Sequence, residues 1–390
     1  MSAGARKLTV LLVAYPFAPV GRDAVGGAEQ VVAALDRGLT QAGHRSIVLA
    51  LRGSSVDGTL VPLDIPPSRI GRDLRDRIYD RVRDSIASLV ERQPIDLVHY
   101  HGYDFCQYLP PAGVTMLATL HLPISFYHPV VFRLGRPRTY LHCVSRSQRA
   151  GCPECEHLLP EIPNGVPVSE LGPPARKRSF ALFLGRICPE KNVHAALDAG
   201  RVAGVPVLVG GKVFPYETHQ RYFDDEVRPR LDRLRRFLGP LGFRAKRRLL
   251  SAARCLLVTS VAPETSCLVA MEALASGTPV IAFRTGALPE LIEHGTTGFL
   301  VEDEREMAAA IHDAADLDAE ACKRAARERF SLDRMLAAYF RAYRGLSAAR
   351  RGGDLATARI VAPSPRRTPR TAPRPSAGWC GGVSRRTIPA

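Results

Sequence analysis

Two carboxylates with seven residues between them mark the segment of this 390-residue chain that is best suited to chemistry. The segment reads PETSCLVAMEALASGTP, and its carboxylates are Glu264 and Glu272. Leu268 to Ala275 is good helix material that a glycine and a proline then stop. The sequence therefore predicts Glu264 in a loop just before a helix and Glu272 about one turn inside that helix.

The start of this helix is a predicted anion site. The amides of Ser266, Cys267 and Leu268 would have no helical partners, and the helix dipole adds positive potential there. A diphosphate suits such a site, and the flanking carboxylates could accept hydrogen bonds from sugar and ribose hydroxyls. Taken alone, the segment also fits an ordinary helix with a negatively charged first turn.

A second segment, FALFLGRICPEKNV, places two cations at a strand-to-helix turn. A buried strand ends at Gly185, Arg186 follows, and Lys191 lies near the start of the next helix. Arginine can bind a diphosphate with two hydrogen bonds and lysine as a point charge. In open parallel sheets ligands bind at the carboxyl ends of strands, where this turn sits. Without the other segments, two surface cations would explain it equally.

Gly26 and Gly27 lie between the first predicted strand and its helix. Paired glycines let the backbone approach a ligand closely. The pattern is not GxGxxG, and the strand Ser46–Leu51 runs into Arg52 instead of an acidic residue. Binding of NAD is therefore disfavoured.

Three histidines lie at the carboxyl ends of two predicted strands. His121 ends the strand Val114–Leu120, and His99 and His101 end the strand before it. A lone histidine is more often a packing residue, but three at the carboxyl ends of adjacent strands favour a functional role for at least one of them.

Short apolar runs alternate with helical patterns along the chain, including helices over Ala28–Ala42, Arg69–Arg92 and Ser331–Arg344. The predicted strands are Leu8–Ala14, Ser46–Leu51, Ile95–Tyr100, Val114–Leu120, Tyr140–Val144, Phe180–Gly185, Val205–Gly210, Cys255–Thr259, Val280–Phe283 and Phe299–Val301. They lack polar alternation, as strands covered by helices on both faces do. The pattern predicts an α/β fold of two Rossmann-like, doubly wound domains.

The stretch Pro167–Lys177, which contains Gly-Pro-Pro at 172–174, indicates a linker between the two halves. We expect an N-terminal acceptor-side domain at 1–168, a nucleotide-sugar-binding domain at 169–330 and a helix at 331–346 that crosses back to the first domain. Residues 347–390 form a basic tail rich in proline and arginine, with little to bury, and are predicted to be disordered.

Composition bounds the partners. The formal net charge is +16, but the tail from Arg350 holds nine arginines against one acidic residue, and no nucleic-acid-binding motif appears. We therefore expect no binding of a specific nucleic acid.

No run of 18 apolar residues occurs, and Leu8–Ala14 is too short for a signal-peptide core. We expect a cytoplasmic protein; a peripheral contact with an anionic membrane stays open.

The nine cysteines are scattered singly except for Cys152 and Cys155. With Cys143 and His157 nearby, a zinc clip is one interpretation. A structural zinc site usually needs two regularly spaced ligand pairs, and the sequence has one. Ordinary thiols in a reducing compartment are the simpler interpretation.

Together these segments resemble family 4 of the glycosyltransferases, the retaining group with the GT-B architecture, from about Leu8 to Arg344. Their order and spacing are more specific than any one of them. The matching motifs are Gly26-Gly27, Thr119-Leu120-His121, Val144-Ser145, Pro163-Asn164-Gly165-Val166, Gly185-Arg186 with Glu190-Lys191, Glu264 with Glu272, Gly277-Thr278-Pro279-Val280 and Gly286-Ala287-Leu288-Pro289-Glu290.

The resemblance implies two domains facing a central cleft and a role for each matching residue. Arg186 and Lys191 would bind the donor diphosphate, and Glu272 would hold the ribose. Glu264 would contact the transferred sugar, and His121 that sugar or the acceptor. The loop at Gly26 and Gly27 would close over the phosphates. No metal is expected, because Arg186, Lys191 and the helix N-terminus would do the work of a cation. No cofactor is expected, since the nucleotide-sugar is a substrate.

The implied activity is transfer of a hexose-type sugar from a nucleotide-diphosphate sugar, with UDP favoured, to a sugar, lipid-linked or small-molecule acceptor. Two departures affect the donor site. Ser266-Cys267 stand where the family often has Phe-Gly, and Gly211-Lys212-Val213 replace a frequent Gly-rich motif, which leaves the charged segment from Tyr216 to Phe237 as a candidate donor contact. A sugar-nucleotide epimerase and a non-enzymatic basic binding protein stay open as alternatives.

Overall fold

The structure, a computed structural model, describes residues 6–66, 71–172 and 176–349. Its two six-stranded sheets contain only parallel strand pairs. The first sheet runs β3 (Thr59–Leu63), β2 (Arg45–Leu51), β1 (Thr9–Val13), β4 (Leu97–Tyr100), β5 (Met116–Leu120), β6 (Thr139–Cys143). The second runs β12 (Gly298–Val301), β11 (Val280–Phe283), β10 (Cys255–Val258), β7 (Ala181–Leu184), β8 (Val207–Gly210), β9 (Arg235–Gly239). Each sheet has the doubly wound strand order, which confirms the predicted fold class.

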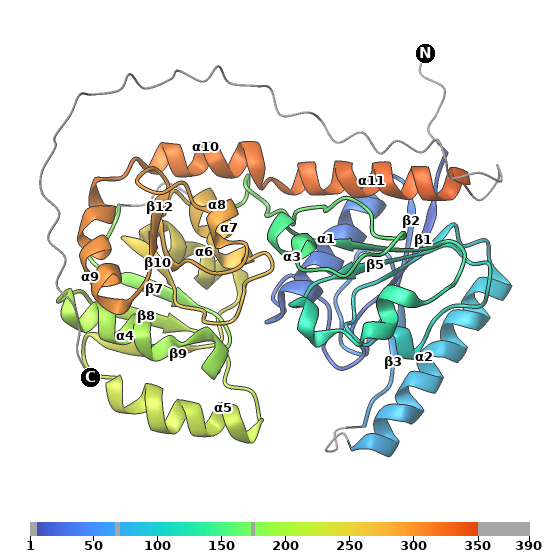
Figure 1. The fold of residues 1–390 in the computed structure, drawn as a ribbon, viewed down its shortest axis with the longest axis horizontal. Helices are drawn as coiled ribbons and strands as arrows, with labels where there is room; N and C mark the ends of the chain where they lie inside the picture. The colour runs from blue at the N-terminus through green and yellow to red at the C-terminus, as the bar shows by residue number, and fades with distance from the viewer. Residues whose placement is uncertain (1–5, 67–70, 173–175, 350–390) are drawn as a thin grey trace, which may run out of the picture. The chain divides into compact units, whose positions relative to one another are not determined.

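Helices alternate with these strands along the chain (Figure 1). In the first half they are α1 (Gly27–Gln41), α2 (Arg72–Arg92) and α3 (Arg146–Ala150). In the second half they are α4 (Val193–Val202), α5 (Glu217–Tyr222), α6 (Phe243–Ala252), α7 (Leu268–Ala275), α8 (Leu288–Leu291), α9 (Glu304–Asp313) and α10 (Ala319–Arg329), and α11 (Leu332–Ala349) follows them.

The ten predicted strands are present, and the two that sequence patterns missed, β3 and β9, each lie at one edge of a sheet, whereas the strands at the opposite edges, β6 and β12, were predicted. In β3 only Leu63 is buried, and β9 has no buried residue and begins with two arginines. An edge strand has one neighbour and much exposed surface, so it need not carry the continuous apolar run that marks an inner strand.

The last helix packs on the first sheet, although the chain reaches it from the second. Tyr339 and Tyr343 of α11 are fully buried in the same core cluster as Val10 and Leu12 of β1. A second contact between the halves lies just before the linker. The Val166 amide donates to the carbonyl of Phe330 at 2.8 Å, and the Leu332 amide donates to that of Val166 at 2.9 Å.

The exact domain boundaries stay predictions, and the tail at 350–390 lies outside the described residues.

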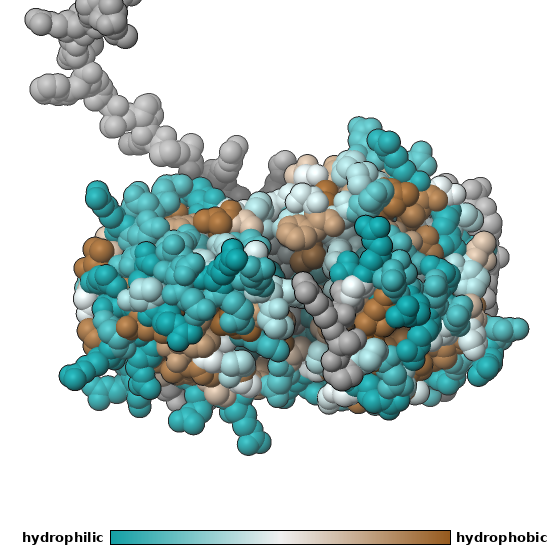
Figure 2. Space-filling view, turned by 90° about the horizontal axis from the view of Figure 1, so that it is seen from below, coloured by the Kyte–Doolittle hydropathy of each residue, from teal (hydrophilic) through white to brown (hydrophobic). Residues whose placement is uncertain are grey.

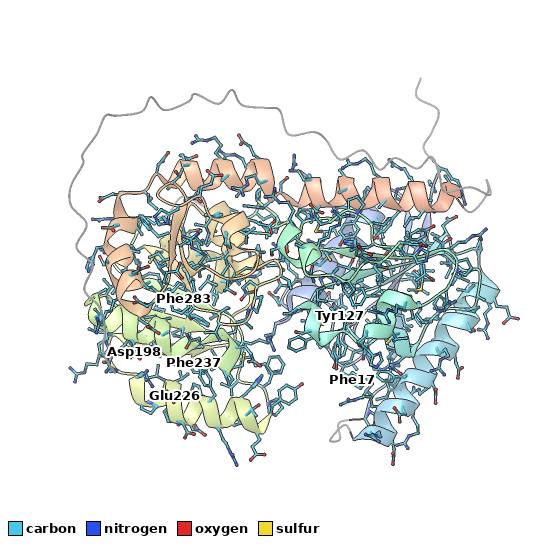
Figure 3. The ribbon with its side chains drawn as sticks, viewed as in Figure 1. Phe17, Tyr127, Asp198, Glu226, Phe237 and Phe283 are labelled. Atoms are coloured by element: carbon cyan, nitrogen blue, oxygen red, sulfur yellow. The ribbon has the colours of Figure 1, made fainter. Side chains whose placement is uncertain are left out.

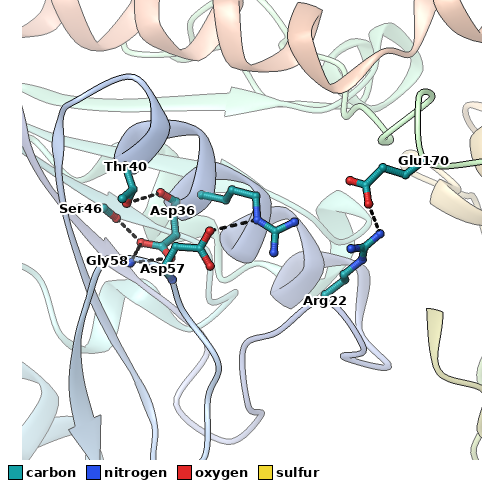
Figure 4. A network of polar contacts seen from close by, with 8 residues as sticks. Arg22, Asp36, Thr40, Ser46, Asp57, Gly58 and Glu170 are labelled. Atoms are coloured by element: carbon teal, nitrogen blue, oxygen red, sulfur yellow. Dashed lines mark hydrogen bonds and ion pairs between the residues drawn. The ribbon is translucent and has the colours of Figure 1, made fainter. Parts of the chain in front are cut away.

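A buried carboxylate fixes α1 to the loop before β3 (Figure 4). Asp36 of α1 is fully buried and accepts hydrogen bonds from the Ser46 hydroxyl at 2.6 Å and from the Asp57 amide at 2.6 Å. The Gly58 amide donates to both of its oxygens at 3.2 Å. These donors offset the cost of burying the carboxylate, so the network fixes the position of α1.

The charged segment from Tyr216 to Phe237 forms its own ion pairs. Arg230 binds Asp198 of α4 at 2.8 Å and Glu226 at 2.9 Å, and these two carboxylates lie on neighbouring helical segments (Figure 3). Farther along, Arg228 binds Asp224 at 2.6 Å. The Arg230–Asp198 pair joins the segment to α4, whereas the other ion pairs lie within the segment; its role as a donor contact stays a prediction.

Candidate active site

Glu264 lies in the loop between β10 and α7, where the resemblance expects it. One of its carboxylate oxygens accepts hydrogen bonds from the ammonium of Lys191 and the hydroxyl of Ser260. Its backbone carbonyl accepts from the Ala287 amide at 2.7 Å. Gly286 has a φ of +54°, and a Cβ atom there would collide with the Glu264 backbone. The loop is therefore fixed on both its side-chain and its backbone sides.

Arg186 and Lys191 occupy the turn between β7 and α4. The Arg186 side chain is exposed, whereas that of Lys191 is 25% exposed beside Glu264, itself 10% exposed. Burial alone would lower the pKa of Lys191, but the Glu264 carboxylate outweighs it and holds that pKa above its ordinary value. Lys191 thus remains charged at neutral pH.

Glu272 points into the protein from α7 and is 3% exposed. Its Oε1 accepts from the ammonium of Lys246 on α6 at 2.5 Å. Its Oε2 is buried and has no hydrogen-bond partner among the described residues. A buried carboxylate oxygen without a donor is costly, so this atom is suited to accept from a ligand hydroxyl.

The start of α7 is shaped by two residues that stand in place of the family's frequent Phe-Gly. Cys267 adopts a left-handed conformation at φ +50°, which explains why glycine is common there. The Ser266 hydroxyl accepts from the side-chain amide of Asn164 at 2.9 Å. The side-chain oxygen of Asn164, Oδ1, is buried and has no partner in the described structure. A side chain at Gly27 would meet Leu268 at 3.2 Å, so the first residues of α1 and α7 face each other.

Gly26 and Gly27 begin α1, with Gly26 in an extended conformation as the N-cap. The Glu29 carboxylate folds back so closely that a Cβ atom at Gly26 would collide with it. Burial raises the pKa of Glu29, and the nearby Arg186 partly counters this. The structure thus brings the glycine loop of the first half to the cations of the second.

Two family models cover most of the described chain. "Glycosyltransferase Family 4" matches residues 25–170, and "Glycosyl transferases group 1" matches residues 178–316. Both halves of the site just described fall within these matches. The chain belongs to family 4 of the glycosyltransferases.

Named relatives agree with the family assignment. A D-inositol 3-phosphate glycosyltransferase of Corynebacterium efficiens is 36% identical over 249 residues, which are 61% of this chain and 49% of the relative. The chain thus spans about half the length of that curated relative. AviGT4, a glycosyltransferase involved in avilamycin A biosynthesis, is 25% identical with a TM-score of 0.65 over 87% of this chain and 98% of its own. Anabaena HepE in complex with UDP-glucose is 18% identical, with a TM-score of 0.63 over 84% and 97% of the two chains, and shows a shared fold.

In this family 4 glycosyltransferase, His121 lies beside the Glu264 loop. The Thr265 hydroxyl donates to the His121 carbonyl at 2.7 Å. The Nε2 atom of His121 is 2.9 Å from Nδ1 of His101, and the two rings stack. Burial, reinforced by His142, lowers the pKa of His121 to about 3, so the ring is neutral at neutral pH. Buried Tyr127 supports the segment that follows, since its hydroxyl accepts from the Leu122 amide at 3.1 Å (Figure 3).

His99 has a packing role instead. It is fully buried, with Nδ1 2.7 Å from the Tyr343 hydroxyl of α11 and Nε2 2.7 Å from the Thr119 hydroxyl. It therefore ties the last helix to the first sheet.

Potential metal ligands converge at one place among the described residues, and this place does not include Cys152 or Cys155. One ligand atom each from Cys188, Glu190 and His219 lie within 4.8 Å of one another. His219 comes from the charged segment after β8, so no sequence spacing could have joined it to Cys188. The expectation that no metal is needed stays a prediction.

A pocket of about 500 Å³ lies in the first half of the protein. Its lining includes Arg72 and Arg75 of α2 together with Tyr79, Tyr103 and His128. Tyr103 also lies against Tyr15, which follows β1 at the carboxyl edge of the sheet. Asp76 and Asp104 line it as well, so the pocket combines cationic, anionic and hydroxyl side chains and is suited to a polar ligand.

Sequence reasoning missed the residues that complete these contacts, namely Lys246, Ser260, Thr265 and Glu29. Lys246 lies 26 positions before Glu272 on another helix, with no motif to link them. Glu29 had a signal, since it follows the paired glycines by two residues.

Proposed function

We propose that this protein transfers a hexose-type sugar from a UDP-sugar to an acceptor, with retention of configuration and without a metal ion. The observation that carries the proposal is the convergence of Arg186, Lys191, Glu264 and the start of α7. Each part suits one part of a nucleotide-sugar. The cations and the backbone amides suit the diphosphate, and the Glu264 carboxylate suits the sugar. Glu272, with its unpartnered oxygen, would take the ribose. UDP is favoured because a protein of the same fold, HepE, holds UDP-glucose.

The mechanism follows from where charge develops. Cleavage of the anomeric bond leaves negative charge on the diphosphate and positive character on the sugar. Arg186, Lys191 and the amides before α7 would stabilise the first charge, and the Glu264 carboxylate the second. The acceptor would attack from the face that the diphosphate leaves, and a departing phosphate oxygen would take its proton. We expect no covalent intermediate with the enzyme.

The acceptor would bind in the pocket of the first half. Arg72 and Arg75 would bind an anionic group of the acceptor in a pocket that Asp76 and Asp104 also line, and the relative named for D-inositol 3-phosphate is consistent with such an acceptor. Replacing Arg75 by alanine should raise the acceptor KM by roughly tenfold or more, since a charge-assisted hydrogen bond contributes about 1.5–3 kcal/mol. Arg77→Ala is the matched control, because Arg77 lies on the same helix and does not line the pocket. Equal KM values for the two variants would contradict this acceptor site.

A donor screen tests the activity itself. Purified protein is incubated with UDP-, GDP- and ADP-sugars, with and without candidate anionic acceptors, and released nucleotide is measured. We expect UDP release that depends on acceptor, persists in EDTA and yields a product with the anomeric configuration of the donor by NMR. A new sugar nucleotide formed from donor alone would instead identify an epimerase, and no release with any pair would favour a binding protein.

A further inference from the structure

Two cysteine thiols outside the transfer site lie in contact. Cys143 ends β6, Cys152 follows α3 by two residues, and their sulfur atoms are 3.3 Å apart. A disulfide bond is about 2.0 Å long, so an approach of about 1 Å would join the two sulfurs. The nine-residue separation along the chain closes only a small loop, with α3 inside it.

The two thiols differ in access and in acidity. Cys143 is fully buried, whereas Cys152 is partly exposed and lines a pocket of about 660 Å³ together with Arg149. The hydrogen bond with Cys143 lowers the pKa of Cys152; burial opposes this, and the Arg149 guanidinium adds to it. The same hydrogen bond, with burial, raises the pKa of Cys143. Cys152 is therefore the thiol that a small oxidant reaches as a thiolate.

We propose that Cys143 and Cys152 are a site of reversible oxidation, at which a hydroperoxide converts the two thiols into a disulfide that alters the loop at His121. The Cys152 thiolate attacks one peroxide oxygen, the O–O bond breaks, and Cys152 becomes a sulfenic acid as hydroxide leaves. The Cys143 sulfur then attacks the Cys152 sulfur, the S–S bond forms, and the sulfenic oxygen leaves as water with the Cys143 proton. The two thiols lose two electrons, and hydrogen peroxide is reduced to two molecules of water.

Gln148 connects this pair to the transfer site. Gln148 lies on α3, between the two cysteines. Its side-chain amide donates to the carbonyls of Leu120 at 2.7 Å and Leu122 at 2.8 Å, the two residues that flank His121. Its side-chain carbonyl accepts from the Val144 amide at 2.8 Å, next to Cys143. A bond that draws Cys152 toward β6 therefore shifts the turn that holds the His121 loop.

Peptide mapping of the full-length protein after hydrogen peroxide tests the site without any assay of sugar transfer. We expect a cross-linked peptide joining Cys143 to Cys152, which dithiothreitol reverses. Cys155→Ser is the matched control, since it removes a partly exposed thiol of the same loop and should still form the cross-link. Hydrogen exchange should show altered deuterium uptake at residues 120–122 in the oxidised protein, but no change in Cys152→Ser.

Two variants keep the test decisive. In Cys143→Ala the oxidised Cys152 should stop at the sulfenic acid and react with dimedone. If removal of buried Cys143 prevents folding, Arg149→Gln replaces it and should slow formation of the cross-link. A dominant Cys152–Cys155 bond, or absence of any cross-link, would overturn the proposal; a cross-link without a change at residues 120–122 would overturn the connection to His121.

Discussion

Glu272 and Lys246 form a buried ion pair in which Lys246 satisfies only one of the two carboxylate oxygens. The other oxygen has no donor in the described part of the chain. We therefore predict two roles for Glu272 that mutation can separate, one in the stability of the α6–α7 contact and one in holding a ligand hydroxyl.

Glu272→Ala should raise the donor KM by roughly ten- to a hundredfold with little change in kcat, because the ribose contact is similar in ground and transition states. It should also lower the melting temperature, since Lys246 loses its partner. The double variant Glu272→Ala with Lys246→Met should recover stability but not KM. A KM that recovers together with stability would exclude the ribose role.

Glu264→Gln should mainly lower kcat, by about ten- to a hundredfold, because we propose that the carboxylate contacts the reacting sugar from a position that Lys191 fixes. Steady-state rates over a range of donor concentrations at saturating acceptor measure this. Glu302→Gln, which changes an exposed carboxylate bound to Arg284, is the control. An unchanged kcat with only a lower melting temperature would mean that the Glu264–Lys191 pair is merely structural.

Arg186→Ala and Lys191→Ala should each reduce kcat/KM by about 1.5–3 kcal/mol of transition-state binding. Their effects on stability should differ. Arg186 is exposed, so its loss should leave the melting temperature near the wild-type value, whereas loss of Lys191 leaves largely buried Glu264 without its cation. Kinetics and thermal unfolding of both variants provide the check, and near-wild-type kcat/KM in both would remove the diphosphate site.

Acid should destabilise the protein through its buried histidines. Burial lowers the pKa of His121 to about 3 and of His142 to about 4, and lowers the pKa values of His99 and His101 as well. The unfolded chain therefore binds more protons below pH 6.5, so stability is complete above that pH and is lost as pH falls toward the folded values. Each histidine contributes up to about 1.4 kcal/mol per pH unit in that window.

Urea unfolding at pH 7.5, 6.5 and 5.5 measures this slope. The raised pKa of buried Glu29 acts in the opposite direction, because that carboxyl takes up its proton more readily in the folded state. Equal free energies of unfolding at pH 7.5 and 5.5 would contradict the buried, neutral state of the histidine cluster. His121 itself should produce no step in the transfer rate near pH 6.5.

Within residues 6–66, 71–172 and 176–349, no helix combines the length and the apolar character that crossing a bilayer requires. The face seen in Figure 2 carries hydrophilic residues over most of its area, with hydrophobic ones in small groups. Whether the basic tail contacts an anionic membrane stays a separate prediction, since residues 350–390 lie outside that description.

The sequence by itself determined the elements that rest on local signals. Helix α7 has the predicted bounds, because the apolar run and the Gly-x-Pro that stops it are contiguous. The inner strands followed from buried apolar runs, and the order of short motifs indicated the family. Edge strands β3 and β9 were missed because exposure removes the run that would reveal them.

Only the tertiary structure decided which residues meet. The sequence placed His99 and His121 alike at the ends of adjacent strands. In the structure His99 lies within β4 and is bound by Tyr343 from the last helix, whereas His121 follows β5 and lies beside Thr265. Lys246 with Glu272, and Cys188 with His219, come from separate segments that the sheet order brings together. Such pairs depend on long-range packing, and neither periodicity nor spacing along the chain encodes it.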